Sequence, residues 1–185
     1  MSDEVGKDAE LLHATCVAVG AHAVLLTGPP GAGKSDLALR LIMSAWPAAM
    51  VAGQPVLVAD DQVIVRREGA RLIARCPPAI AGRLEVRGIG IVETAWCERA
   101  EVRLVAELSR EQAMARMPAA ESLEILGTTI ARTLLQPDEP SAPMKLLLAL
   151  DRAGGDPDIN AKGLAPDAGS RQSLAPDVHL IPLKE

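Results

Sequence analysis

A stretch of eight residues has the types and spacing needed to bind phosphate. Residues 28–35 read GPPGAGKS and fit the pattern G-x-x-x-x-G-K-[ST] at every fixed position. Glycines in such a loop let successive backbone N–H groups point at phosphate oxygens, and the positive end of the following helix adds to the attraction. We therefore expect a nucleotide-phosphate site made by Gly28, Pro29, Pro30, Gly31, Ala32, Gly33, Lys34 and Ser35.

Four polar side chains near this loop have separate expected roles. Lys34 would bridge the outer phosphates, and the Ser35 hydroxyl would hold Mg²⁺. Asp60 and Asp61 end the apolar run VLVAD, where the carboxyl end of a strand delivers side chains to the crevice beside the loop. One aspartate would act near the metal and the other could accept a proton, although either alone could be a solvated turn residue. Because alternation along a straight strand sends neighbouring side chains to opposite faces, a pair in one site requires a local bend.

The phosphate loop is predicted to join a β-strand to an α-helix. Residues 11–20 and 22–28 are apolar, β-rich runs, which predicts two strands joined by a tight turn. After the loop, apolar residues recur at helical spacing up to Trp46-Pro47, because a residue before proline avoids the helical region. These helical positions are Leu37, Ala38, Leu41 and Ile42.

The rest of the chain adds strands and two helices. Strands are predicted over residues 55–60, 62–67, 71–76 and 100–108. Ser109 with Gln112 resembles a capping box for a short helix, and Ser141 is expected to cap a second helix through residue 153. The predicted fold class is α/β, with a mixed β-sheet flanked by helices. Residues 1–153 would form one catalytic domain, and residues 154–185 a Gly-, Pro- and Asp-rich tail ordered by a partner subunit.

Composition narrows the classes of partner. A net charge of -5 without a basic run argues against nucleic acid, and the chain contains no Phe or Tyr to stack on single strands. No apolar run approaches the roughly 20 residues of a membrane span, so we expect a soluble, cytoplasmic protein. Cys16, Cys76 and Cys97 lack zinc-ligand spacing and are expected to be reduced and structural. His22 and His179 match no motif and are expected at the surface.

The sequence around these motifs resembles the HPr kinase/phosphorylase family, whose members phosphorylate and dephosphorylate a seryl residue of the phosphocarrier protein HPr. The resemblance runs from about Leu12 to about Leu108, and its strongest elements are His13, the phosphate loop, LVADDQV at residues 57–63 and LEVRGIGIV at residues 84–92. It implies the P-loop kinase fold of the family's C-terminal domain, in a short form without the N-terminal domain of longer members. It also implies ATP and Mg²⁺ as cofactors, HPr or an HPr-like carrier as partner, and a homo-hexamer.

The resemblance assigns roles to individual residues. The implied catalytic residues are Asp61, His13, Lys34 and Arg87, and the implied Mg²⁺ ligands are Ser35, Asp60 and Glu85. Asp61 would take the proton from the acceptor serine and return it in the reverse reaction. Independently of the family, Glu85 and Arg87 are two apart on an expected strand and hence on one face. A carboxylate for metal beside a guanidinium for phosphate suits phosphoryl transfer, whereas a solvated pair of charges is the alternative.

One family segment has no match in this sequence. The family's later Pro-Gly-Arg-Asn segment, whose arginine assists catalysis, is replaced at residues 134–150 by LLQPDEPSAPMKLLLAL. Lys145 and Arg132 are candidate replacements, or surface charges. The resulting hypothesis is an ATP- and Mg²⁺-dependent serine kinase acting on HPr, with reverse phosphorolysis by inorganic phosphate. The alternatives are a kinase for a small metabolite and a non-catalytic, nucleotide-dependent regulator.

Overall fold

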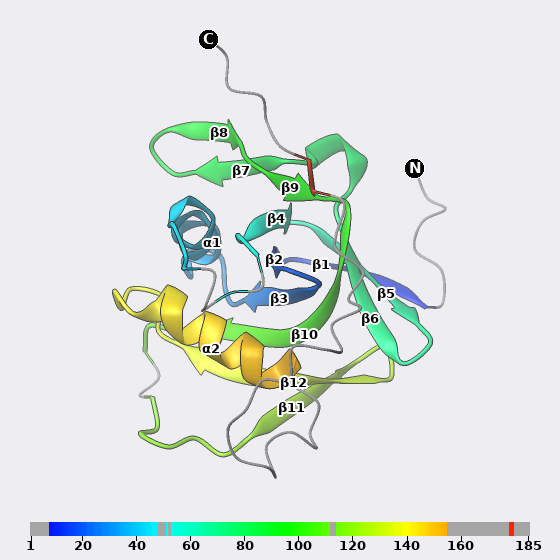
Figure 1. Cartoon of the computed structure of the whole chain (residues 1–185), viewed down its shortest axis with the longest axis vertical. Helices are drawn as coiled ribbons and strands as arrows, with labels where there is room; N and C mark the ends of the chain where they lie inside the picture. Colours follow the sequence, from blue (N-terminus) through cyan, green and yellow to red (C-terminus); the bar gives the residue numbers. More distant parts are fainter. Residues whose placement is uncertain (1–7, 48–50, 52, 112–113, 155–177, 180–185) are drawn as a thin grey trace.

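The computed structural model describes residues 8–47, 51, 53–111, 114–154 and 178–179, and within them a large mixed sheet carries two α-helices on one face (Figure 1). The sheet has eleven strands in the order β1-β5-β6-β10-β3-β2-β4-β9-β13, and β12 pairs with both β10 and β11. Its strands are β1 (Ala9–Leu12), β2 (Thr15–Val19), β3 (His22–Thr27), β4 (Val56–Ala59), β5 (Val63–Glu68), β6 (Arg71–Arg75), β9 (Trp96–Cys97), β10 (Arg99–Leu108), β11 (Glu121–Ile125), β12 (Thr128–Leu135) and β13 (Val178–His179).

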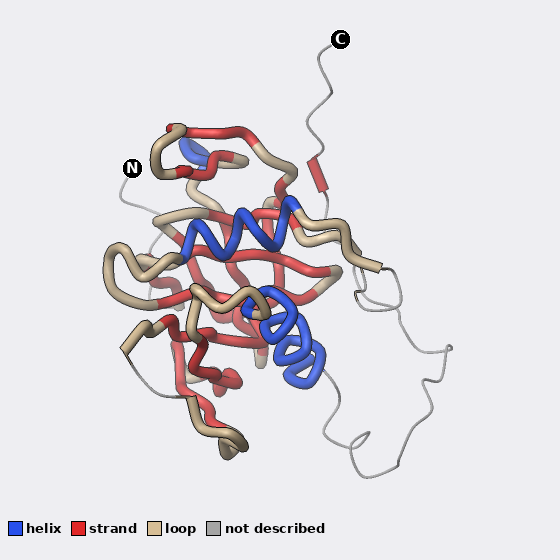
Figure 2. The backbone as a smooth tube through the Cα atoms, turned by 90° about the vertical axis from the view of Figure 1, so that its left-hand side faces the viewer, coloured by secondary structure: helices blue, strands red, loops and turns tan. Residues whose placement is uncertain are grey.

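The remaining elements are the two α-helices, one short 3₁₀-helix and a separate hairpin. Helix α1 spans Lys34–Met43 and α2 spans Ala142–Gly154, and the 3₁₀-helix η1 spans Pro78–Ile80. Strands β7 (Arg83–Val86) and β8 (Gly90–Glu93) pair only with each other and lie beside α1 (Figure 1). Figure 2 shows both helices in front of the same strands.

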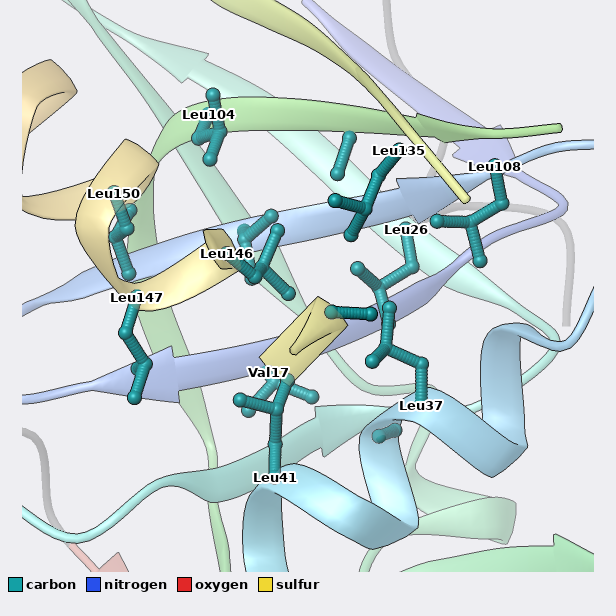
Figure 3. Packing of buried hydrophobic residues seen from close by; sticks show 14 of the residues in the cluster. Val17, Leu26, Leu37, Leu41, Leu104, Leu108, Leu135, Leu146, Leu147 and Leu150 are labelled. Atoms are coloured by element: carbon teal, nitrogen blue, oxygen red, sulfur yellow. The ribbon is translucent and has the colours of Figure 1, made fainter. Parts of the chain in front are cut away.

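Both faces of the central strands are buried, because their alternate residues enter two different cores. Val17 and Leu26 belong to the core beneath the helices, whereas their neighbours Cys16 and Leu25 face the second core, which β5 and β6 help to enclose. Helix α1 contributes Leu37 to the first core, and α2 contributes leucines to it (Figure 3). In a chain without Phe or Tyr, these interdigitating aliphatic side chains form the interior.

Most elements predicted from the sequence are present. The α/β class with a mixed sheet is confirmed, as are α1, α2 and the strands β2 and β3 before the phosphate loop. The helix predicted from Ser109 is wrong for the described residues 109–111 and 114–120, which contain none. A β11–β12 hairpin follows them instead, with Leu126 and Gly127 at positive φ in its two-residue turn. Of the predicted tail, residues 155–177 and 180–185 lie outside the described part, and β13 pairs with β9.

All three cysteines are at least partly buried. Cys16, Cys76 and Cys97 are free thiols, and burial raises the pKa of all three, that of Cys97 to about 11 and that of Cys76 to about 12. They therefore stay protonated and poorly nucleophilic at neutral pH. In the described part of the chain, no helix has the length and apolar character needed to cross a bilayer.

The two unassigned histidines differ in setting. His179 is exposed and stacks on Trp96 with ring centroids 4.4 Å apart. His22 is half-buried against the end of α2, since a Cβ built on Gly154 would lie 2.6 Å from its Nδ1, so it is only partly at the surface. Burial lowers the pKa of His22 from 6.5, and the charge of Arg103 lowers it further. Folding thus disfavours the protonated ring.

This shift makes stability depend on pH. The unfolded chain protonates His22 at a higher pH than the folded chain does. Neutral His22 therefore makes its full contribution to the free energy of unfolding above about pH 6.5, and this contribution is lost as pH falls below that value. We expect His22→Gln to lose less unfolding free energy than the wild type between about pH 7.5 and about pH 5. Urea unfolding across that range measures this, and equal losses in both proteins would contradict the prediction.

Candidate active site

The phosphate loop connects β3 to α1, and its three glycines adopt conformations that other residues avoid. Gly28, Gly31 and Gly33 have φ angles of 140°, 78° and 94°. A Cβ on Gly28 would lie 2.8 Å from the carbonyl oxygen of Leu108 in β10, so the loop passes too close to this strand for a side chain. The loop thus has the tight, glycine-dependent path that its sequence predicts.

Lys34 begins α1 and folds back over the loop. Its side chain is buried, at 8% exposure, and Nζ donates to the carbonyl oxygens of Gly28 at 3.1 Å and Pro29 at 3.3 Å. Nζ also lies 3.3 Å from Nε2 of His13. The ammonium group is therefore held at the loop by backbone acceptors.

Asp60 follows β4 directly and is almost completely buried, at 5% exposure. Its Oδ1 accepts hydrogen bonds from the hydroxyls of Thr15 at 2.7 Å and Ser35 at 2.9 Å, and its Oδ2 accepts one from the backbone N–H of Glu85 at 3.1 Å. These bonds place the Asp60 carboxylate directly beside the Ser35 hydroxyl. The structure therefore brings together the predicted metal residues Asp60 and Ser35, with the Glu85 backbone against them.

The next residue, Asp61, points elsewhere because the backbone turns sharply. Its φ is 65°, and the N–H of Gln62 donates to the carbonyl oxygen of Asp60 at 2.8 Å, the hydrogen-bond pattern of a γ-turn. This is the local bend that a pair of neighbouring aspartates in one site requires. A strained conformation of this kind is maintained only by its surroundings, and such conformations cluster at functional sites. Asp61 is exposed, in contrast to Asp60.

His13 connects Asp61 with Lys34. The sequence places it on a strand, but it lies in the break between β1 and β2, which frees its ring to reach both residues. Nδ1 is 3.0 Å from Oδ1 of Asp61, and Nε2 is 3.3 Å from Nζ of Lys34. Because an ammonium can only donate, a neutral ring with its proton on Nδ1 satisfies both contacts.

One pocket of about 600 Å³ joins these residues to the β7–β8 hairpin. All four predicted catalytic residues line it, namely His13, Lys34, Asp61 and Arg87, and so do Ser35 and Glu85. Asp60 does not line the pocket and lies behind Ser35 instead. Arg87 was predicted on the strand, but it lies in the turn after β7. The conformation of this turn, and not the alternation of a strand, therefore decides which face of the hairpin its side chain occupies.

The comparison with known proteins decides the family. A model of the HPr serine kinase C-terminal domain matches residues 7–136. The chain belongs to this family. HPr kinase/phosphorylase proteins from Burkholderia lata and Burkholderia multivorans are each 33% identical to it over 136 residues, covering 68% of this chain. The chain spans only 39% of the length of these relatives.

The family fold is also found among solved structures. The structure titled Hpr(Ser) kinase/phosphatase from Coxiella burnetii aligns with a TM-score of 0.64 and covers 83% of this chain and 99% of that one. Its sequence identity is 23%, so this likeness concerns the fold. Together with the family match, it confirms the resemblance and the fold class inferred from the sequence.

The donor set suits the metal that the family resemblance implies. Mg²⁺ prefers oxygen ligands and uses few from the protein, because it keeps water and substrate phosphates. Ser35 and Glu85 offer oxygens toward the pocket, and Asp60 bonds the Ser35 hydroxyl from behind. Within the described ranges, no group of three His, Cys, Asp or Glu side chains could form a metal centre. A site completed by phosphate oxygens fits this composition better than an all-protein site.

The two candidates for the missing family arginine are engaged elsewhere. Arg132 on β12 bonds Glu107 and Glu121, with Nε 3.0 Å from Glu107 Oε2, and Lys145 on α2 contacts the Glu139 carboxylate. Neither lines the pocket. Arg110 and Asp138 line it instead, and the sequence analysis missed both. No local pattern signals them, because they are 28 residues apart and meet only in the fold.

The two adjacent aspartates are expected to differ in their contribution to stability. Asp60→Asn exchanges an acceptor oxygen for an NH₂ donor and removes the charge that strengthens three hydrogen bonds. We expect it to lower the free energy of unfolding by about 1–3 kcal/mol.

Asp61→Asn is the matched control, because this side chain is exposed and Asn tolerates positive φ. Its expected change is within about 0.5 kcal/mol. Urea unfolding measures both variants, and equal effects would show that Asp60 is not the structural member of the pair.

Proposed function

We propose that this domain is an ATP- and Mg²⁺-dependent serine kinase that phosphorylates HPr or an HPr-like carrier. The observation that carries the proposal is Asp61, an exposed carboxylate in a strained turn on the wall of the phosphate-loop pocket, bonded to His13. A pure nucleotide sensor has no need of a proton acceptor at that place. The Burkholderia relatives are named HPr kinase/phosphorylase, which supports HPr as the carrier.

The nucleotide would bind through the loop. Backbone N–H groups of residues 28–35 and the Lys34 ammonium would hold its phosphates. Ser35 and Glu85 would hold the metal, with Asp60 bonded to the Ser35 hydroxyl behind it. Mg²⁺ would supply charge neutralisation on the β- and γ-phosphates. Arg87 reaches the same pocket from the hairpin and would bind the transferred group by charge-assisted hydrogen bonds.

Asp61 would act on the acceptor. As the seryl oxygen forms its bond to the γ-phosphorus, the bond from that phosphorus to the bridging oxygen breaks, and the hydroxyl proton goes to the Asp61 carboxylate. His13 would orient this carboxylate through its Nδ1 contact of 3.0 Å. In the reverse direction, inorganic phosphate would attack phosphoserine and form pyrophosphate, and Asp61 would return the proton to the serine oxygen.

The setting of the enzyme is part of the same proposal. The family resemblance supports a cytoplasmic homo-oligomer, a hexamer by analogy, that needs no nucleic acid or membrane. The net charge of -5 agrees with the absence of a nucleic-acid partner. A regulatory role in sugar phosphotransfer and carbon metabolism would follow from phosphorylating such a carrier.

The test uses HPr and its paralogues incubated with the purified chain, ATP and Mg²⁺, followed by mass spectrometry. We expect a seryl phosphate with the wild type and a loss of at least about 100-fold in rate with Asp61→Asn, because general-base catalysis contributes about 10²–10⁴-fold. ATP affinity measured by calorimetry should be nearly unchanged in this variant.

Lys34→Ala is the control for the nucleotide site and should lose affinity as well as activity. Parallel loss of affinity and activity in Asp61→Asn would contradict the role of Asp61. ATP binding without transfer to any carrier would favour the regulator, and transfer to a metabolite alone would favour the metabolite kinase.

A further inference from the structure

Arg110 lies just after β10 and enters the nucleotide pocket beside the phosphate loop. Its Nη1 donates to the carbonyl oxygen of Gly31 at 2.7 Å. Gly31 lies in the middle of the loop, among the residues whose N–H groups are expected to surround the phosphates. Arg110 Nη2 is also 3.6 Å from the position that a Cβ on Gly33 would take. The guanidinium therefore lies directly beside Gly31 and Gly33 of the loop.

Asp138 fixes this guanidinium. Nε of Arg110 donates to Oδ2 at 2.6 Å and Nη2 donates to Oδ1 at 3.1 Å, a bidentate pair that sets the plane of the group. Hydrogen bonding to Asp138 raises the pKa of Arg110, and the same bonding lowers the pKa of Asp138. Both groups thus stay charged near neutral pH.

The segment that carries Asp138 is itself held against the loop. Arg40 of α1 donates to the carbonyl oxygens of Pro137 and Glu139, and a Cβ on Gly33 would lie 3.3 Å from Cβ of Pro137. Hydrogen bonds and close contacts therefore connect Arg110, Asp138 and the phosphate loop, although both side chains are exposed. These contacts distinguish Arg110 from a free surface arginine.

Arg110 has unused hydrogen-bond donors, and it lies in a pocket with more carboxylates than cations. A guanidinium has five N–H donors, and three bonds to Asp138 and Gly31 do not exhaust them. Four carboxylates line the pocket, on Asp36, Asp61, Glu85 and Asp138, against the cations Lys34, Arg87 and Arg110. A nucleoside triphosphate brings further negative charge, so a fixed cation at the loop favours its binding.

We propose that Arg110 is a phosphate-binding residue that contacts the terminal phosphate of the nucleotide, and that Asp138 positions it. This inference rests on the proposed nucleotide binding but not on the identity of the acceptor. Arg110 reaches the loop from the segment after β10, whereas Arg87 comes from the β7–β8 hairpin. Two arginines from separate segments would thus share the transferred group with Lys34.

Calorimetric titration of the whole chain with Mg-ATP and with Mg-ADP tests the proposal. We expect Arg110→Ala to weaken ATP binding about tenfold or more and ADP binding by less than about threefold, because a charge-assisted hydrogen bond to the γ-phosphate exists only with ATP. Arg110→Lys keeps the charge but not the fork, and it should lie between the wild type and Arg110→Ala. Thermal unfolding checks that each variant is folded.

Arg99→Ala is the matched control. Arg99 is also on the β10 segment, is similarly exposed at 45% against 52%, and bonds a carboxylate, Glu68, at 2.7 Å, but it does not line the pocket. It should leave both affinities unchanged. On its own, Asp138→Asn should weaken ATP binding. Added to Arg110→Ala, it should have no further effect, because a positioning residue acts only through the residue that it positions.

Three results would overturn the proposal. Equal losses for ATP and ADP in Arg110→Ala would mean that Arg110 only shapes the loop, and unchanged affinities would mean that it does neither. Additive effects of Arg110→Ala and Asp138→Asn would deny the positioning role of Asp138. Failure of the wild type to bind ATP would refute the proposed function itself, whereas ATP binding without transfer to HPr leaves this test fully interpretable.

Discussion

The carboxylate of Asp60 is the interaction on which the site depends. A buried charge is tolerated only when hydrogen bonds replace its water, and Asp60 obtains them from three separate parts of the chain. Thr15 belongs to β2, Ser35 to the first turn of α1, and the Glu85 N–H to β7. The same group that needs these donors therefore links the central sheet, the phosphate loop and the hairpin to one another.

Two identical neighbouring residues act differently because the backbone turns between them. Asp60 faces inward and accepts three hydrogen bonds, whereas Asp61, at φ 65°, faces the pocket. Among the interactions identified in the described residues, the Asp61 side chain contacts only His13. The inner residue supplies rigidity, and the outer one remains available to a substrate.

The sequence predicted what depends on contiguous patterns. The phosphate loop, its flanking strand and helix, and the Asp60-Asp61 pair are local signals. In the structure Asp61 lines the pocket with the loop, and Asp60 bonds Ser35 behind it. It did not predict the β11–β12 hairpin, because Leu126 occupies a positive-φ position that glycine or asparagine normally marks. Arg110 and Asp138 were missed because their pairing depends on how distant loops meet, for which composition and periodicity carry no signal.

The separate β7–β8 hairpin has a consequence for how readily the site forms. Among residues 83–93 only Leu84 is buried, while Ile89 and Ile91 are 77% and 69% exposed. Elements with so few buried contacts occupy the low end of local stability and exchange their amide hydrogens early. Glu85 and Arg87 belong to this hairpin. The nucleotide affinity of the proposed site therefore scales with the fraction of molecules in which the hairpin is packed against α1. Amide protection factors in β7 would thus report how far this side of the site is preorganised.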